Sequence, residues 1–107
     1  MKVIWLSKAS VRSHQVLSYG KKTFGPNTIL RFQMRVEKEV KKLAVFPELG
    51  KREPLLFGYR QKEYRCLVIK PHFKLIYYVN DEKNTVFISH FWDTRRNPST
   101  QVEEVKE

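Results

Sequence analysis

The clearest pattern of apolar and polar positions lies between residues 27 and 46. Apolar side chains recur there at intervals of three and four residues, at Ile29, Phe32, Val36, Val40 and Leu43. This interval returns to the same face of an α-helix, so the segment predicts an amphipathic helix, with Asn27 as its expected cap. A weaker stripe predicts a helix over about residues 8–22, and the short connection makes the two helices antiparallel neighbours.

Three later segments are rich in β-branched and aromatic residues and predict strands. They cover residues 64–70, 73–80 and 85–92, and turn-forming residues connect them. A short β-prone run at residues 3–6 comes before the first helix. The order β-α-α-β-β-β predicts an α+β fold, in which the two helices of the N-terminal half pack on one face of a small, mostly antiparallel sheet.

Side chains alternate between the two faces of a strand, and this assigns the residues of the middle strand. Tyr77 shares a face with Leu75 and Val79 and is expected in the core, whereas Lys74 and Tyr78 share the other face. With both helices on one side, we expect the second face to be open to solvent.

The length of 107 residues suits one domain, which we expect to span residues 1–98, followed by a short acidic tail at 99–107. No apolar run reaches the roughly 20 residues that span a membrane. Cys66 is the only cysteine, so an intrachain disulfide is excluded and a reducing, cytoplasmic location is expected.

Charge points to a polyanionic partner. The 21 Lys and Arg residues exceed the 11 acidic residues and give a formal net charge of +10. Such an excess repels itself in a compact domain, and its common use is to bind nucleic acid or an acidic protein.

Several cations stand in or beside the predicted strands. Arg65 and Lys74 lie on neighbouring strands, and the adjacent Arg95 and Arg96 follow Asp93 at the end of the last strand. Adjacent strands are about 5 Å apart, so cations at matching levels can converge on one anion. Arginine binds phosphate oxygens bidentately, so the pair is a candidate anion clamp, while a salt bridge with Asp93 is the structural alternative.

Four further residues near these strands are candidates for nucleic-acid binding: Lys70, Tyr78, Arg60 and His90. A metal or cofactor site is not predicted, since the three histidines lie in different elements and the lone cysteine forms no zinc pattern. No glycine-rich phosphate loop and no nucleophile elbow is present either.

The run YRCLVIKPHFKLIYYVNDE and the ending VFISHFWDTRRNP resemble the RelE/ParE superfamily, the toxins of type II toxin–antitoxin modules that include plasmid stabilisation systems. The resemblance covers roughly residues 1–98. It implies one of two activities. RelE-like members inhibit translation as metal-independent endoribonucleases that cut mRNA at the ribosome, and ParE-like members poison DNA gyrase without cutting RNA.

For the RelE-like activity, which we take as the leading hypothesis, the resemblance implies particular catalytic residues. Arg65 and Lys74 match strand positions that carry basic catalytic groups, and Arg95 or Arg96 matches the arginine at the end of the final strand. Asp93 lies where several relatives have a histidine and is the candidate base. No aromatic residue or histidine follows the last strand, however, and the Arg95-Arg96-Asn97-Pro98 ending resembles ParE-like endings slightly more.

Three hypotheses therefore remain: a ribosome-associated endoribonuclease, a gyrase poison, and a degenerate toxin that only binds nucleic acid or its antitoxin. All three include an acidic cognate antitoxin, because a domain with a charge of +10 suits an acidic segment.

Overall fold

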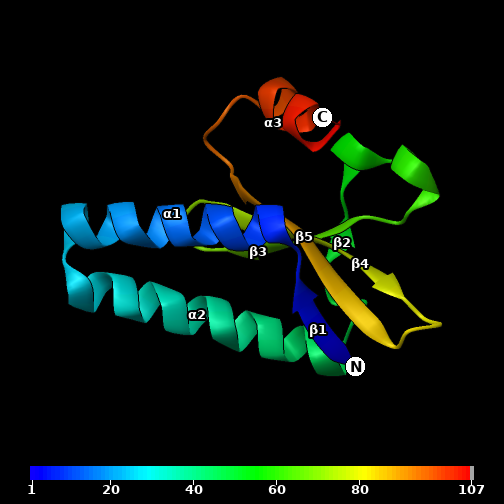
Figure 1. Ribbon diagram of the computed structural model, residues 1–107, viewed down its shortest axis with the longest axis horizontal. Coiled ribbons are helices and arrows are strands. Elements are labelled where there is room, and N and C mark those ends of the chain that lie inside the picture. Colours follow the sequence, from blue (N-terminus) through cyan, green and yellow to red (C-terminus); the bar gives the residue numbers. More distant parts are fainter. Residues whose placement is uncertain (107) are drawn as a thin grey trace.

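The computed structural model describes residues 1–106 (Figure 1). The elements follow in the order β1 (Lys2–Trp5), α1 (Ser7–Phe24), α2 (Pro26–Val45), β2 (Lys51–Arg52), the 3-10 turns η1 (Pro54–Leu56) and η2 (Tyr59–Gln61), β3 (Arg65–Ile69), β4 (Phe73–Asn80), β5 (Thr85–Asp93) and α3 (Pro98–Lys106). The predicted α+β class and the order of its main elements are confirmed.

One sheet holds all the strands in the order β1-β5-β4-β3-β2. The pairs β2–β3, β3–β4 and β4–β5 are antiparallel, and β1 runs parallel to its neighbour β5. The two-residue strand β2 was not predicted, because it has no strand pattern of its own and exists through its pairing with β3.

The helices α1 and α2 form an antiparallel hairpin that covers one face of the sheet (Figure 1). The stripe of α2 packs there as predicted, with Phe32, Val36 and Leu43 buried against strand residues that include Leu75 and Tyr77. The expected cap is wrong: Gly25, at a φ of 91°, occupies the position before α2, and Pro26 is the first helical residue. A positive φ favours glycine, and proline suits the first helical position.

The second face of the sheet is covered as well, so the expected open face is wrong. Leu56, Tyr64, Ile76, Trp92 and Val105 form a second buried cluster. Val105 belongs to α3, which lies beside the turns η1 and η2 in Figure 1. The segment predicted as an acidic tail thus contains a helix that packs on the sheet.

An irregularity in β5 decides which way its last residues point. Ile76 of β4 pairs with His90, and the next residue of β4, Tyr77, pairs with Ile88. Ser89 is therefore an extra residue in β5, and a bulge of this kind shifts the alternation of side chains. As a result, Ile88 and Phe91 belong to the cluster under the helices, and Trp92 belongs to the cluster under α3.

Candidate functional site

Arg65 and Lys74 do not meet, although the sequence predicted that they would. Arg65 pairs with Tyr77 in the register of β3 and β4, and Tyr77 faces the helical hairpin. Lys74 lies on the other face, with its ammonium group 5.1 Å from the ring centre of Trp92. The sheet itself separates these two cations, so the prediction that they gather on one bare face is wrong.

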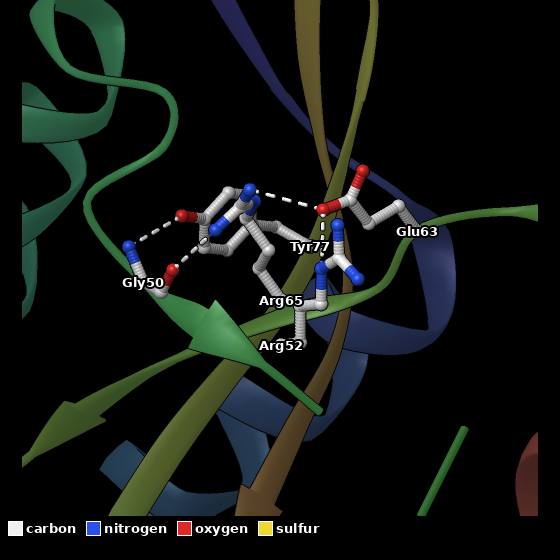
Figure 2. A network of polar contacts seen from close by, with 5 residues as sticks. All are labelled: Gly50, Arg52, Glu63, Arg65 and Tyr77. Carbon is white, nitrogen blue, oxygen red and sulfur yellow. Dashed lines mark hydrogen bonds and ion pairs between the residues drawn. The ribbon is translucent and has the colours of Figure 1, made fainter. Parts of the chain in front are cut away.

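Arg65 holds the chain between α2 and β2 against the sheet (Figure 2). Its guanidinium donates to the carbonyl of Gly50 at 2.8 Å and to Glu63 at 3.0 Å, while the N–H of Gly50 donates to the Tyr77 hydroxyl at 2.8 Å. Arg52 donates to the same Glu63 oxygen at 2.9 Å. Burial raises the pKa of Tyr77, so the phenol stays neutral. The contacts of the Arg65 guanidinium are therefore structural.

Lys74 pairs with a buried carboxylate of the same chain. Its ammonium group forms an ion pair with Glu53, a carboxylate that is 2% exposed, and it also faces the Trp92 ring. Burial of this carboxylate requires a positive partner, because an unpaired buried charge is strongly destabilising. Sequence reasoning missed Glu53, since it lies in an irregular connector with no local signal for burial.

Asp93 and Arg95 pair with each other, which is the structural alternative stated for them above. The Asp93 carboxylate accepts hydrogen bonds from the Arg95 backbone N–H at 2.9 Å and from its guanidinium at 3.1 and 3.2 Å. Partial burial alone would raise the pKa of Asp93, but these contacts outweigh it and the pKa is lowered. A carboxylate held this way is a weak base, which does not favour Asp93 as the acceptor of a ribose proton.

Arg96 points away from Arg95 and binds the last helix. Its guanidinium contacts both carboxylate oxygens of Glu104 in α3, at 2.6 and 3.3 Å. The hydrogen bonds from Arg96 lower the pKa of Glu104. Arg96, Glu104, Lys8 and Arg12 line a cavity of about 410 Å³ between the start of α1 and the end of β5. The acid of the predicted tail therefore neutralises part of the predicted anion clamp.

The sequence Asn97-Pro98 starts α3. The Asn97 side-chain oxygen accepts a hydrogen bond from the Ser99 N–H at 2.9 Å, and Pro98 is the first helical residue. Asparagine as a cap and proline at the first position are both favoured at a helix start. This signal was present in the sequence, which we interpreted only as the end of a strand.

Three of the four candidate nucleic-acid residues come together. Tyr78, Arg60 and His90 line one cavity of about 330 Å³ on the α3 side of the sheet. Lys70 is not among the residues that line it; it is exposed in the turn between β3 and β4, where its carbonyl accepts a hydrogen bond from Arg35 at 2.8 Å. Lys8 and Lys62 also line this cavity and were not predicted.

His90 is held as a neutral imidazole. Burial, and then the charge of Lys8, lowers the pKa of His90 to about 4. Its Nδ1 lies 2.9 Å from the Ser89 hydroxyl oxygen. Within residues 1–106 no group of three or more His, Cys, Asp or Glu side chains could hold a metal ion.

Comparison with known proteins decides the family. A family model described as the ParE toxin of the type II toxin–antitoxin system parDE matches residues 3–98. This chain belongs to the ParE toxin family. The resemblance to the RelE/ParE superfamily is thereby confirmed, and of its two branches the match is to ParE. Among curated proteins, no match is found.

A solved structure has a similar fold. The chromosomal ParDE toxin–antitoxin system from P. aeruginosa contains a chain that is 18% identical, with a TM-score of 0.67. The similarity covers 87% of this chain and 95% of that chain. Within the part of this ParE-family chain that the structure describes, no helix combines the length and apolar character needed to cross a membrane.

Proposed function

We propose that this chain is the toxin of a ParDE-type pair and that it poisons DNA gyrase without cutting RNA. The observation that carries the proposal is the ParE toxin match over residues 3–98. The similar chain from P. aeruginosa is also part of a ParDE system. Gyrase poisoning is the activity that the resemblance to ParE-like toxins implies, so a gyrase poison replaces the endoribonuclease as the favoured function.

The arrangement of the cations also favours a gyrase poison over an endoribonuclease. Cleavage by a ribose 2′-OH needs a base and several cations around one phosphate. Here Arg65 and Lys74 lie on opposite faces, and Asp93 accepts hydrogen bonds from Arg95. A gyrase poison needs a folded surface that fits the enzyme, and it does not require these groups to converge.

The proposal includes an acidic antitoxin as the natural partner. A net charge of +10 favours an acidic segment, whose binding would relieve repulsion within the toxin. Exposed apolar side chains on the helical hairpin offer contact area for such a segment: Val11, Tyr19, Phe24, Leu30 and Met34. Apolar groups rimmed by charge are common at protein interfaces.

Two assays on the purified chain test the proposed target. In the first, DNA gyrase, ATP and relaxed plasmid are incubated with the chain, and we expect less supercoiling and more cleaved DNA trapped on gyrase. In the second, the chain is added to a translation reaction, and we expect intact mRNA. Codon-specific mRNA cuts with undisturbed supercoiling would reject the proposal and restore the endoribonuclease.

A variant separates the two activities further. Arg95→Ala removes one of the two candidate catalytic arginines of the nuclease hypothesis, and Arg95 is 67% exposed in its side chain. If the chain is a gyrase poison whose contacts lie elsewhere, Arg95→Ala should retain gyrase inhibition within about twofold, since exposed ion pairs contribute little to stability. A chain that affects neither gyrase nor mRNA would instead be the degenerate binder.

A further inference from the structure

The cavity that contains Tyr78, Arg60 and His90 is lined mainly by tyrosines and cations, and we call it the tyrosine cavity. Three tyrosines, Tyr59, Tyr64 and Tyr78, contribute to its wall. Three cations, Lys8, Arg60 and Lys62, surround them, and no carboxylate of residues 1–106 takes part in the lining. Its volume of about 330 Å³ lies at the small end of the roughly 300–1,000 Å³ range of small-molecule sites.

The three cations form no ion pairs in the described part of the chain. None of them forms an ion pair with a carboxylate of residues 1–106, whereas Arg52, Arg65, Lys74, Arg95 and Arg96 all do. Lys8 donates to the backbone carbonyl of Glu104 at 3.2 Å. The ammonium group of Lys62 lies 4.4 Å from the ring centre of Tyr78, and Arg60 lies 5.4 Å from that of Tyr59. The charge of Lys8 also lowers the pKa of the Glu104 carboxylate, so Lys8 is partly neutralised, whereas an anion in this cavity would meet Arg60 and Lys62 without an ion-paired carboxylate among residues 1–106.

The aromatic side chains form a continuous wall. The rings of Tyr59 and Tyr64 stack with centres 6.1 Å apart, and the rings of Tyr64 and Tyr78 make an edge-to-face contact with centres 5.5 Å apart. Tyr64 is buried, whereas Tyr59 and Tyr78 are half-buried and expose part of their rings. Burial raises the pKa of Tyr64, so its phenol adds no negative charge at neutral pH. Tyrosine rings beside cations match a ligand that has both a flat aromatic group and a negative group.

Two further features of the lining favour a negative ligand. His90, neutral above a pKa of about 4, offers hydrogen bonding without adding a charge to be desolvated. Ser7 and Lys8 also line the cavity, and they belong to the first turn of α1, which has no acidic residue and no side-chain cap. The positive end of the α1 dipole therefore adds to the charge of the three cations.

We propose that the tyrosine cavity binds a nucleoside phosphate, with the base against the exposed tyrosine rings and the phosphate between Lys8 and Lys62. The ligand is bound and no bond is broken. It is either a free mononucleotide or one nucleotide of a single strand, since both present the same base and phosphate. This site does not depend on gyrase as the target. Its tests can therefore support or reject nucleotide binding independently of the proposed function.

The first test compares two charge reversals of equal size on the full chain. Lys62→Glu changes the tyrosine cavity, and Lys41→Glu changes an exposed lysine of α2 outside it. Adenosine 5′-monophosphate and a fluorescently labelled pentathymidylate DNA strand are the probes, and binding is followed by amide chemical shifts and by fluorescence anisotropy. We expect Lys62→Glu to weaken binding about tenfold and Lys41→Glu to weaken it less than about twofold. Equal losses would show general attraction to a basic protein and would overturn the proposal.

The second test concerns the ring. Tyr78→Phe keeps the aromatic surface and should bind within about twofold of the natural chain, whereas Tyr78→Leu should lose about fivefold or more. Inorganic phosphate should compete at least about tenfold less well than adenosine 5′-monophosphate; equal competition would overturn the part assigned to the base.

Binding of the mononucleotide alone identifies a free ligand, and binding of the DNA strand alone identifies a nucleotide within a chain. Chemical shift changes confined to residues outside the cavity overturn the site.

Discussion

At the scale of single residues, the role of a charged side chain depends more on the group that it contacts than on its residue type. Lys74 was a candidate catalytic group because it is a cation on a strand. In the structure it forms an ion pair with Glu53 and faces the Trp92 ring. A lysine that neutralises a carboxylate 2% exposed stabilises the fold through that contact.

Replacement of Lys74 tests this structural role. Lys74→Met should lower the free energy of unfolding by about 3 kcal/mol, because it leaves the Glu53 carboxylate buried without its cation. The double variant Glu53→Leu/Lys74→Met should recover most of that loss, since neither charge then remains. Guanidinium denaturation followed by circular dichroism measures both values. Lys70→Met is the control at an exposed lysine, and a Lys74→Met chain as stable as this control would contradict the role.

His90 makes stability depend on pH. Its folded-state pKa of about 4 lies below the ordinary value of 6.5, so the unfolded chain binds the proton more tightly. Its contribution is therefore fully present above about pH 6.5 and is lost as the pH falls toward 4. One pKa unit corresponds to about 1.4 kcal/mol, and screening of this partly exposed group leaves about 1–2 kcal/mol over that interval.

A His90→Gln variant isolates this contribution. Acidification also protonates Asp93 and Glu104, whose lowered pKa values work in the same direction, so the natural chain alone gives no assignment. The loss of unfolding free energy between pH 7 and pH 4 should be about 1–2 kcal/mol smaller in His90→Gln than in the natural chain. Urea denaturation at several pH values measures the difference, and parallel curves would rule the effect out.

Much of the candidate site could not be predicted from residue types. Adjacent arginines can be recognised in the sequence, but their acids come from different places: Asp93 is two residues away, and Glu104 is in another helix. The burial of Glu53 depends on how an irregular connector folds over β4, which no periodicity records. Tyr78, Arg60 and His90 are candidates for nucleic-acid binding in the sequence, but the sequence does not show that they line one cavity.

At the scale of elements, the sequence predicted those with a repeating apolar pattern. The apolar stripe of α2 and the alternation along β4 follow their expected periods, and β3 and β5 form at the predicted positions, with the alternation of β5 broken at Ser89. The helix α3 offers only Val102 and Val105 as apolar contacts, too few for a periodic signal. The bulge at Ser89 depends on the pairing with β4, and a strand sequence alone does not show its partner's register.

The packing of α3 can be tested at one position. Val105→Asp places a charge in the cluster of Leu56, Tyr64, Ile76 and Trp92, so α3 should detach and expose apolar surface. We expect the free energy of unfolding to fall by about 2–3 kcal/mol, with increased binding of a hydrophobic dye and faster amide exchange in residues 98–106. Glu103→Asp is the matched control at an exposed position of the same helix and should change neither. Unchanged amide exchange in Val105→Asp would mean that α3 does not need this contact.

At the scale of the whole molecule, positive charge is spread over the surface and both faces of the sheet are covered. The sheet lies between two buried clusters, one under the helical hairpin and one under α3. The 21 Lys and Arg residues greatly outnumber the ion pairs among residues 1–106, which are the six formed by Lys42, Arg52, Arg65, Lys74, Arg95 and Arg96. Repulsion among the remaining cations opposes the compact state.

This balance predicts that salt stabilises the isolated chain. Salt screens exposed charges over a Debye length of about 10 Å at 0.1 M, so it weakens the repulsion of a +10 surface. It also weakens exposed ion pairs, but each of these contributes no more than about 1 kcal/mol. We expect the free energy of unfolding to rise by about 1 kcal/mol between about 0.05 and 0.5 M NaCl, measured by urea denaturation.

In a Lys38→Glu/Lys41→Glu variant the net charge falls by four, from +10 to +6, and the gain in the free energy of unfolding with salt should shrink accordingly. Lower stability in salt would show that the ion pairs outweigh the repulsion, and would remove the relief of repulsion as a reason for an acidic partner to bind.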